Sequence, residues 1–421
     1  MNDFIERKLS NGIRVYYYSD KSLKRVYASI NIEYGTNGYY DEFFYGDKEY
    51  HTKPAMAHFL EHYLIETSKN GNMLLKYFDK NYEANGITYP DLTTYYFVGI
   101  DSKKKIYDSI RELLTMVEEP VFNNENVEQI KKAICQELTS GEDNRYQIAL
   151  SSVRHNLHTS YDAVPVDNNV LGSIESTESI SLDDVKLCYN AYYNDENKFI
   201  VIAGNIDIDE VHKLLNSYYK KRPLHKNLLK EYCYGLDTGV RNKLEIINMP
   251  TDADIVESSF KIKIDKNLSL LEQSFYIEIY MTSKLANSRK EIEKLMESKH
   301  IISGISFFSD YFKGMCDVTV SYESNKPKSS IKKIEDILNE KKFSKKEFEL
   351  LKKDAIVKEI RAKDHMYYIF KLFPTRLEFS KHFDDIKEYN NFTFEKYKKY
   401  ISKIDFKFET TTIITKKRIR K

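Results

Sequence analysis

The residues best suited to chemistry lie in the stretch PAMAHFLEHYLIE, residues 54–66. If this stretch is helical, His58 and His62 project from the same face because they are four residues apart, and Glu61 lies at the edge of that face. Two imidazoles held in this way can bind one Zn²⁺, and the adjacent carboxylate can act as general base toward a water molecule that the metal activates. The order HxxEH is the inverse of the HExxH zinc-protease motif. The stretch therefore predicts a metal site in which Glu61 is the base.

The same stretch also has the pattern of an ordinary core helix. Its apolar side comprises Met56, Phe59, Leu60, Tyr63 and Leu64. A short motif can also arise by chance in a chain of 421 residues. The core and metal interpretations concern opposite faces of one helix, so a third ligand carries more weight than the motif alone.

Glu137 is the candidate for that third ligand, because it falls on the apolar stripe of residues 127–139, which lie within a predicted helix. The stripe contains Ile130, Ala133 and Ile134. A carboxylate that faces a core is costly unless it is paired or coordinates a metal, and no Lys or Arg shares the stripe within one turn. With His58 and His62 it would complete a two-His, one-Glu set that leaves a position for water, as in catalytic zinc sites. The alternative is that Glu137 tilts into solvent beside Gln136.

The sequence around these residues predicts the strands and helices that would hold them in place. Residues 14–19 and 26–35 alternate polar and apolar side chains and predict a hairpin or two neighbouring strands. Residues 39–53 are predicted as a loop and residues 87–100 as one strand. The helices predicted in this half cover residues 54–66, 72–78, 103–119, 123–140, 145–158, 181–193 and 207–221, and a buried strand is predicted at 198–204.

The pattern restarts in the second half of the chain. Strands are predicted at 243–250, 258–264, 302–312 and 314–323, and helices at 268–285, 327–340 and 345–371. Both halves run from strands to helices, which predicts an α+β fold of two similar domains, each a mixed sheet packed by helices. The chain is also longer than a single hydrophobic core usually supports. We expect a zinc-binding domain at 1–221, a linker at 222–244 and a domain without the motif at 245–421.

Composition narrows the classes of partner. The chain has 65 Lys and Arg against 64 Asp and Glu, so its overall charge gives no reason to expect nucleic acid or an anionic membrane surface. The charge is uneven, because residues 1–220 carry 23 basic and 34 acidic side chains and the remainder carries 42 and 30. The four cysteines form no CxxC pair, and neither a signal-like start nor a long apolar run is present. We therefore expect a cytoplasmic protein that does not enter a membrane.

Two segments carry a resemblance to a known family. AMAHFLEHYLIE at residues 55–66, followed by ICQELTSGEDN at residues 134–144, resembles the inverzincin peptidases, the family of pitrilysin, insulin-degrading enzyme and the mitochondrial processing peptidase. The resemblance covers the first half of the chain and is to the short bacterial members, whereas the second half is similar in pattern only. It implies that the three ligands named above bind one Zn²⁺ per chain, with Glu61 as the general base.

The resemblance also implies a place for substrate. Asn85, within EANGITYPDLTTYY, matches an asparagine at the start of an edge strand, to which an extended peptide adds as another strand. Two positions depart from the family pattern. The family often has a second glutamate one heptad before the third ligand, where this chain has Ile130, and its usual alanine after the asparagine is Gly86 here. The first departure is expected to lower activity or change its pH dependence without removing a ligand.

Short members of this family resemble half of a clamshell, so the resemblance implies that two chains enclose the reaction chamber. The partner is either a second copy or a related subunit without the motif, and no Arg–Tyr pair of the kind that partners supply can be assigned in this chain. The resulting prediction is a zinc-dependent endopeptidase that hydrolyses small unfolded peptides inside a dimeric chamber, with a ribosomally made peptide precursor as the first substrate. The alternatives are a general peptide-scavenging peptidase and a non-catalytic peptide-binding or assembly subunit.

Overall fold

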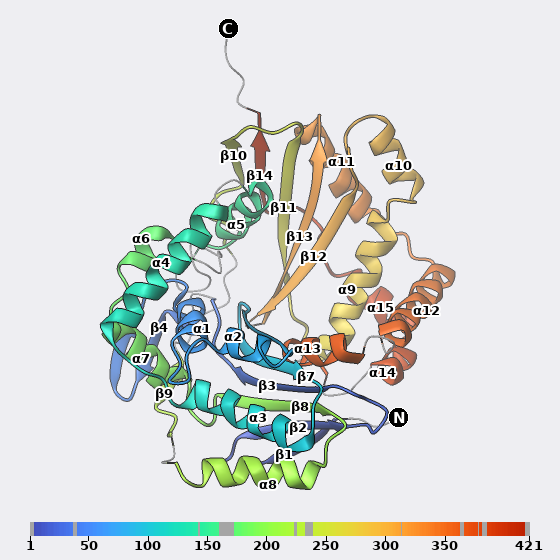
Figure 1. The fold of residues 1–421 in the computed structure, drawn as a ribbon. Coiled ribbons are helices and arrows are strands. Elements are labelled where there is room, and N and C mark those ends of the chain that lie inside the picture. The colour runs from blue at the N-terminus through green and yellow to red at the C-terminus, as the bar shows by residue number, and fades with distance from the viewer. Residues whose placement is uncertain are drawn as a thin grey trace.

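The computed structural model arranges the chain around two large sheets (Figure 1). The described residues are 4–36, 40–141, 144–159, 172–222, 225–231, 239–312, 314–362, 366–377, 379–380 and 385–416. The first sheet lies in the lower part of the view and the second in the upper part, and helices pack against both. This confirms the predicted α+β architecture of mixed sheets covered by helices.

The first sheet has six strands, and its order differs from the one predicted. In spatial order they are β1 (Ile5–Lys8), β2 (Arg14–Ser19), β8 (Lys198–Gly204), β3 (Val26–Ile32), β7 (Thr93–Gly99) and β6 (Glu83–Thr88). The prediction that β2 and β3 are neighbours is wrong, because β8 lies between them, parallel to β2 and antiparallel to β3. Strand β8 is apolar at every position after Lys198 and buried throughout, so it is most stable in the interior of a sheet, between two neighbours.

The strand predicted at 87–100 is also divided in the structure. Strands β6 and β7 form an antiparallel pair, and the chain turns between them at Pro90 and Asp91. Proline lacks the N–H that a central strand needs, and a Pro-Asp pair favours a turn. As a result β6 becomes the last strand of the sheet and has a neighbour on one side only.

Seven helices described in the first half surround this sheet and its core. They are α1 (Met56–Glu66), α2 (Met73–Phe78), α3 (Lys103–Glu118), α4 (Asn124–Gly141), α6 (Ile174–Glu178), α7 (Leu182–Tyr192) and α8 (Ile208–Tyr219). Two of them start with ordinary side-chain caps: the Ser181 hydroxyl accepts from the Asp184 N–H at α7, and the Asp207 carboxylate accepts from the Glu210 N–H at α8. Local sequence thus determines where α7 and α8 begin.

The second sheet has five strands. In spatial order they are β10 (Leu244–Asn248), β14 (Thr410–Thr415), β11 (Asp254–Lys263), β13 (Met315–Ser324) and β12 (Ile305–Phe312). The helices described in this half are α9 (Leu270–Leu285), α10 (Lys290–Glu297), α11 (Pro327–Asn339), α12 (Lys345–Ala362), α13 (Met366–Arg376), α14 (Ile386–Asn391) and α15 (Phe394–Ile401). The single helix predicted over 345–371 therefore corresponds to two elements, α12 and α13.

A small third sheet joins two distant segments. Strands β4 (Glu42–Tyr45) and β5 (Lys48–His51) form a hairpin through Gly46, whose φ of 66° is in the left-handed region that such tight turns require. Strand β9 (Leu229–Glu231) pairs with β4. The loop predicted at 39–53 is thus a hairpin, and part of the predicted linker is a strand that belongs to the first half. The domain boundaries at 221 and 245 stay a prediction.

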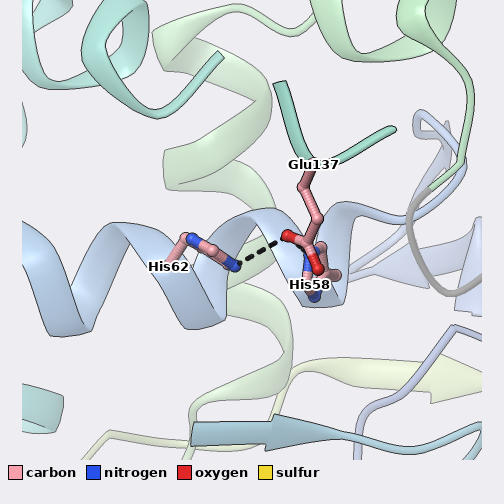
Figure 2. A group of neighbouring side chains, drawn as sticks. All are labelled: His58, His62 and Glu137. Carbon is pink, nitrogen blue, oxygen red and sulfur yellow. Dashed lines mark ion pairs between the residues drawn. The ribbon is translucent and has the colours of Figure 1, made fainter. Parts of the chain in front are cut away.

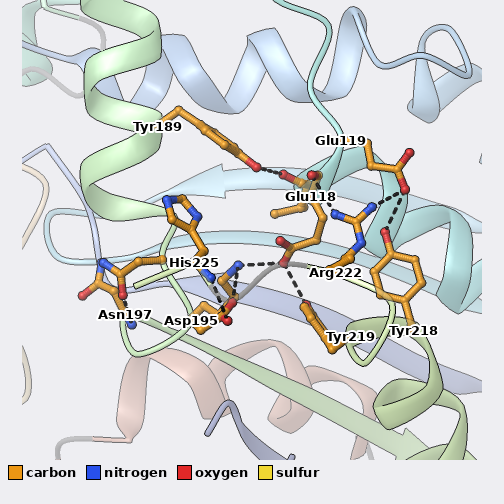
Figure 3. A network of polar contacts seen from close by, with 12 residues as sticks. Glu118, Glu119, Tyr189, Asp195, Asn197, Tyr218, Tyr219, Arg222 and His225 are labelled. Carbon is orange, nitrogen blue, oxygen red and sulfur yellow. Dashed lines mark hydrogen bonds and ion pairs between the residues drawn. The ribbon is translucent and has the colours of Figure 1, made fainter. Parts of the chain in front are cut away.

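A polar network holds the start of the predicted linker (Figure 3). The fully buried Lys198 ammonium donates to Glu118 at 2.7 Å and lies 3.6 Å from Asp195. Arg222 donates to the backbone oxygen of Glu118 at 2.9 Å, and the His225 N–H donates to Asp195 at 3.4 Å. Because removing one partner would leave a buried charge uncompensated, this network fixes where the chain leaves the first half.

Each half also sends one helix to the sheet of the other half. Helix α5 (Arg145–Leu157) packs against β11 and β14 of the second sheet, where Ala149, Ile255 and Ile414 form a small core. Helix α13 packs against β3 and β8 of the first sheet, where Phe370 and Phe373 join a cluster of tyrosines. This reciprocal exchange ties the two sheets together, and both helices are visible in Figure 1.

Candidate metal centre

Helix α1 is fixed at both ends and along one face. It begins after Ala55, a non-glycine residue in the left-handed region with φ 61°, and the Thr67 N–H donates to the carbonyl oxygen of Tyr63 at its end. The Tyr63 hydroxyl donates to the carbonyl oxygen of Val121 at 2.9 Å, between α3 and α4. All the apolar side chains predicted to face the core are buried in the first half. The core interpretation of this helix is therefore confirmed.

The structure brings the three predicted ligands together (Figure 2). His58 and His62 lie side by side on α1, with ring centroids 4.6 Å apart, and Glu137 reaches them from α4. One oxygen of Glu137 is 3.5 Å from His58 Nε2 and 3.6 Å from His62 Nε2. Ligand atoms from all three side chains lie within 4.8 Å of one another, and no other such cluster occurs in the residues that the structure describes.

The surroundings of His58 suit a cation. The residue is 6% exposed, and among the described residues neither ring nitrogen has a hydrogen-bond partner. A buried polar group without a partner is costly, and a metal ion would satisfy it. Two imidazoles and one carboxylate are also a donor set that zinc accepts, with a position left for water. The residues present therefore fit a divalent metal.

The electrostatics of the cluster indicate the same requirement for positive charge. Burial lowers the pKa of His58, but the carboxylates of Glu137 and Glu61 outweigh it and raise this pKa to about 9. Interaction with His58 lowers the pKa of Glu137, against the opposing effect of burial. The site is thus built around negative carboxylates, and either a proton or a metal ion can compensate them.

Glu61 lies beside the cluster and outside it. It is 7% exposed, and its Oε2 is 3.6 Å from His58 Nδ1. The Thr88 hydroxyl, on β6, donates to the same Oε2 at 2.8 Å. One oxygen of Glu61 is therefore held by β6, and the carboxylate is oriented beside the three ligands.

Two residues that sequence reasoning missed support the site. The Glu66 carboxylate is 2.8 Å from His62 Nδ1, an arrangement that orients a ligating imidazole and leaves Nε2 for the metal. The role of Glu66 could have been predicted from the sequence, because it follows His62 by four residues on the same helix. The role of Thr88 could not, because Thr88 lies on β6 and meets Glu61 only in the folded chain.

Asn85 lies apart from the metal cluster, on the edge strand β6 where the prediction placed it. It is exposed, and its Oδ1 accepts the N–H of Gly86 at 3.0 Å. The N–H of Gly86 is therefore directed away from β7 and satisfied locally. This N–H is therefore placed to donate to an incoming strand in place of Asn85.

The structure shows what surrounds Gly86 and Ile130, the two positions that depart from the family pattern. A Cβ at Gly86 would lie 2.4 Å from Ile65 Cδ1 and 2.5 Å from Glu61 Oε1, so α1 approaches β6 too closely for alanine without movement. Ile130 is fully buried in the core between α4 and its neighbours. That position packs as an apolar side chain and adds no carboxylate to the site.

Comparison with known proteins places this geometry in context. A family model described as the peptidase M16 inactive domain matches residues 179–354, a stretch that does not include the cluster. The chain is 26% identical over 306 residues to an uncharacterized zinc protease, YmfH, of Bacillus subtilis, covering 71% of this chain and 69% of that protein. A crystal structure of an M16-like peptidase from Alicyclobacillus acidocaldarius matches with a TM-score of 0.86 at 19% identity, over 98% of both chains. In sequence and in fold the chain is thus similar to members of the M16, or inverzincin, family.

Other M16 relatives show the range of the family. Pitrilysin matches with a TM-score of 0.75 at 16% identity over 99% of this chain, which spans 45% of the pitrilysin chain. The chain thus has the fold of about half of that larger protein. A Helicobacter pylori protein named a non-peptidase homolog, YmxG, is 24% identical over 251 residues, 58% of this chain and 56% of that protein. Among the described helices, none is both long and apolar enough to cross a bilayer.

Proposed function

We propose that this chain is a zinc-dependent endopeptidase. The observation that carries the proposal is the cluster of His58, His62 and Glu137 with Glu61 beside it and outside it. This division of roles is the one that hydrolysis needs, since three side chains can hold the metal while a fourth remains available for proton transfer. Names of relatives that contain the words zinc protease support the same function.

The residues of the chain would divide the chemistry as follows. The bound Zn²⁺ supplies Lewis acidity toward water and the scissile carbonyl. Glu61 takes the proton of the attacking water at Oε1, because its Oε2 accepts from Thr88, and returns that proton to the leaving amine. Glu66 holds His62 with Nε2 directed at the cluster.

The substrate would be a peptide in extended conformation. Strand β6 ends its sheet, so a peptide can pair with its outer edge, and Asn85 would then release the Gly86 N–H to that peptide. Such pairing recognises mainly the backbone groups of the peptide, which favours small unfolded peptides over folded proteins. A ribosomally made precursor is the first substrate to test, and general peptide scavenging is the alternative within the enzyme class.

The proposed assembly is a closed dimer. The chain spans 45% of pitrilysin, so a second subunit is expected to complete the chamber, either another copy or a related chain without the motif. A cytoplasmic location remains a prediction from the sequence.

A non-catalytic peptide-binding or assembly subunit is the second candidate. Two observations favour it: Ile130 stands where the family often has a carboxylate, and one relative is named a non-peptidase homolog. The two candidates differ in one measurable property. Both can bind metal and peptide, whereas only the first hydrolyses the peptide.

The experiment combines metal analysis with peptide hydrolysis. We expect about one zinc per wild-type chain and a large loss of zinc in His58→Ala, His62→Ala and Glu137→Gln. Glu66→Gln should weaken zinc binding by about 10- to 100-fold, since outer partners of metal ligands contribute this much.

Glu61→Gln should retain zinc and lose hydrolysis, because an amide cannot accept the proton. His51→Ala is the matched control, since His51 lies on β5 outside the cluster and should leave both readouts unchanged. Zinc retained in either histidine variant of the cluster would refute the site. Zinc without hydrolysis in the wild type, tested with candidate partners present, would favour the non-catalytic subunit.

A further inference from the structure

The two faces of strand β6 make different contacts. On one face, Gly86 lies against Glu61, and the Thr88 hydroxyl donates to Glu61 Oε2 at 2.8 Å. Alternate residues of a strand point to opposite sides, so Glu83, Asn85 and Ile87 face away from α1. The position of β6 therefore affects both the proposed base and the proposed peptide-binding edge.

On the opposite face, β6 is held by a residue from the second half of the chain. The Lys371 ammonium, on α13, pairs with Oε1 of Glu83, the first residue of β6. The Tyr96 hydroxyl of β7 donates to the same oxygen at 3.5 Å, and Lys371 lies 4.9 Å from the centre of the Tyr96 ring. Two elements, α13 and β7, thus meet at the Glu83 carboxylate of β6.

The backbone of α13 around Lys371 is held in place because neighbouring side chains of the helix are buried. Phe370 is buried, with its ring centre 5.4 Å from that of Tyr18. Phe373 is buried as well, stacked on Phe4 with ring centres 3.7 Å apart. The aromatic contacts hold α13 on the first sheet, so the ammonium of Lys371 is delivered to β6 at a defined place.

Strand β6 needs such support more than an interior strand does. Among the described strands it pairs with β7 alone, and its outer edge makes no ladder that would hold it in place. An edge strand that must accept a peptide gains from a contact on its face, since that contact leaves the edge open.

We propose that Lys371 and Glu83 are positioning residues through which α13 of the second half fixes β6 for peptide binding. This inference rests on the proposed peptidase function, and it adds that the second half acts on the site within one chain. The route runs from the aromatic anchor of α13 through the Lys371–Glu83 pair to β6, and from β6 to Glu61 through Thr88.

The test uses the full-length zinc-loaded protein and a quenched fluorescent peptide. Lys371→Met and Glu83→Gln should each raise KM by about two- to fivefold with little change in kcat, which is the range for a half-exposed ion pair. Amide hydrogen exchange of residues 83–88 should accelerate by a similar factor, and zinc content should stay unchanged. The exchanged pair Lys371→Glu with Glu83→Lys should recover most of both losses.

Lys358→Met is the matched control, because it breaks an ion pair of 3.1 Å with Asp354 on the neighbouring helix α12. It should leave KM and the exchange of β6 at their wild-type values. Unchanged KM and exchange in both single variants would overturn the proposal, as would an exchanged pair no better than either single variant. A wild-type protein without hydrolysis would count against the peptidase function alone, because the exchange of β6 would still decide the coupling.

Discussion

The two large sheets are covered in different ways. The first sheet is apolar on both faces: one face contributes to the main core of the first half, and the other packs Tyr16, Tyr18 and Tyr27 against α13. The second sheet is mainly apolar toward α9, where Val318 and Val320 are buried. Its other face, toward α5, is mostly polar around a small apolar core of Ala149, Ile255 and Ile414. The helix that crosses from each half therefore meets a different kind of surface.

The contacts of α5 with the second sheet are mostly polar. They join Tyr146 to Glu323, Arg154 to Asp310, Ser152 to Glu245 and Thr412, Asn156 to Glu245, and His158 to Asp317. Apolar packing depends little on pH or salt, whereas buried and half-buried charges depend on both. The packing of α13 on the first sheet should therefore be stable across pH and salt, whereas the packing of α5 on the second sheet should respond to both.

The largest effect on stability is expected from disrupting the aromatic packing of α13 against the first sheet. Phe373→Ala removes a ring that is 2% exposed and should lower the free energy of unfolding by about 4 kcal/mol, since it leaves a cavity. Urea unfolding at two pH values and two salt concentrations should give the same loss each time. Leu350→Ala, at a side chain 65% exposed, is the control and should change stability by less than about 0.5 kcal/mol.

Breaking the buried pair of His158 and Asp317, which joins the end of α5 to the second sheet, should lower the free energy of unfolding slightly less. His158 and Asp317 are 2% and 5% exposed, with 2.6 Å between Nε2 and Oδ2. Asp317→Ala should lower the free energy of unfolding by about 3 kcal/mol, because it leaves His158 without this carboxylate in a buried place. Burial raises the pKa of Asp317, against the opposing effect of His158, so this loss should shrink as pH rises through that raised pKa, whereas the loss in Phe373→Ala should not. A loss that does not change with pH would contradict the difference between the contacts of α5 and those of α13.

Glu257 provides the pH dependence in its simplest form. It is 3% exposed on the α5 side of β11, and burial raises its pKa to about 7, against the opposing effects of Ser321 and Arg154. The folded state therefore binds more protons than the unfolded state between the ordinary pKa of 4.5 and about 7. The stability that this group contributes is present below that window and is lost as pH rises through it.

Glu257→Gln should abolish this loss, since an amide stays neutral. The variant should gain up to about 2–3 kcal/mol over wild type as pH rises from 4.5 to 7. Urea titrations across that range would measure the difference. Ser259→Ala, on the same face of the same strand, controls for general effects of substitution and should show no such slope. Parallel curves for wild type and Glu257→Gln would show that the carboxyl titrates normally.

The smallest effect is expected at the exposed end of α5. Tyr146 is 50% exposed, and the hydrogen bond of its hydroxyl to Glu323 raises its pKa to about 12. Tyr146→Phe should cost about 0.5 kcal/mol, because solvent screens the pair. A double-mutant cycle with Glu323→Gln would isolate this energy, and added salt should reduce it. A coupling energy as large as that of the buried His158–Asp317 pair would remove the contrast within α5.

Part of this contrast could be predicted from the sequence. The run KFIVIAG is apolar at every position but its first, as a strand buried on both faces requires, whereas MCDVTVSYES alternates, as a strand with one polar face requires. The order of the strands could not be predicted in the same way. Strand β8 enters between β2 and β3 from about 170 residues further along the chain, and no local pattern specifies that pairing.

The metal cluster shows the same division between local and tertiary information. Helical spacing alone places His58 beside His62 and Glu66 within reach of His62, because residues four apart share a face. The spacing within α4 gives the face on which Glu137 lies. Only the crossing of α1 and α4 decides that this face meets the histidines, since helix packing depends on the whole core.

The contacts of β6 belong entirely to the tertiary structure. Thr88 reaches Glu61 across 27 residues, and Lys371 reaches Glu83 across 288. The family resemblance implied an edge strand that starts near Asn85, whereas the sequence pattern predicted one strand over residues 87–100 and missed the turn that makes β6 a separate strand. Which helices lie on its two faces was decided by the packing of both halves, because contacts between distant segments form only when the apolar surfaces that carry them are buried together.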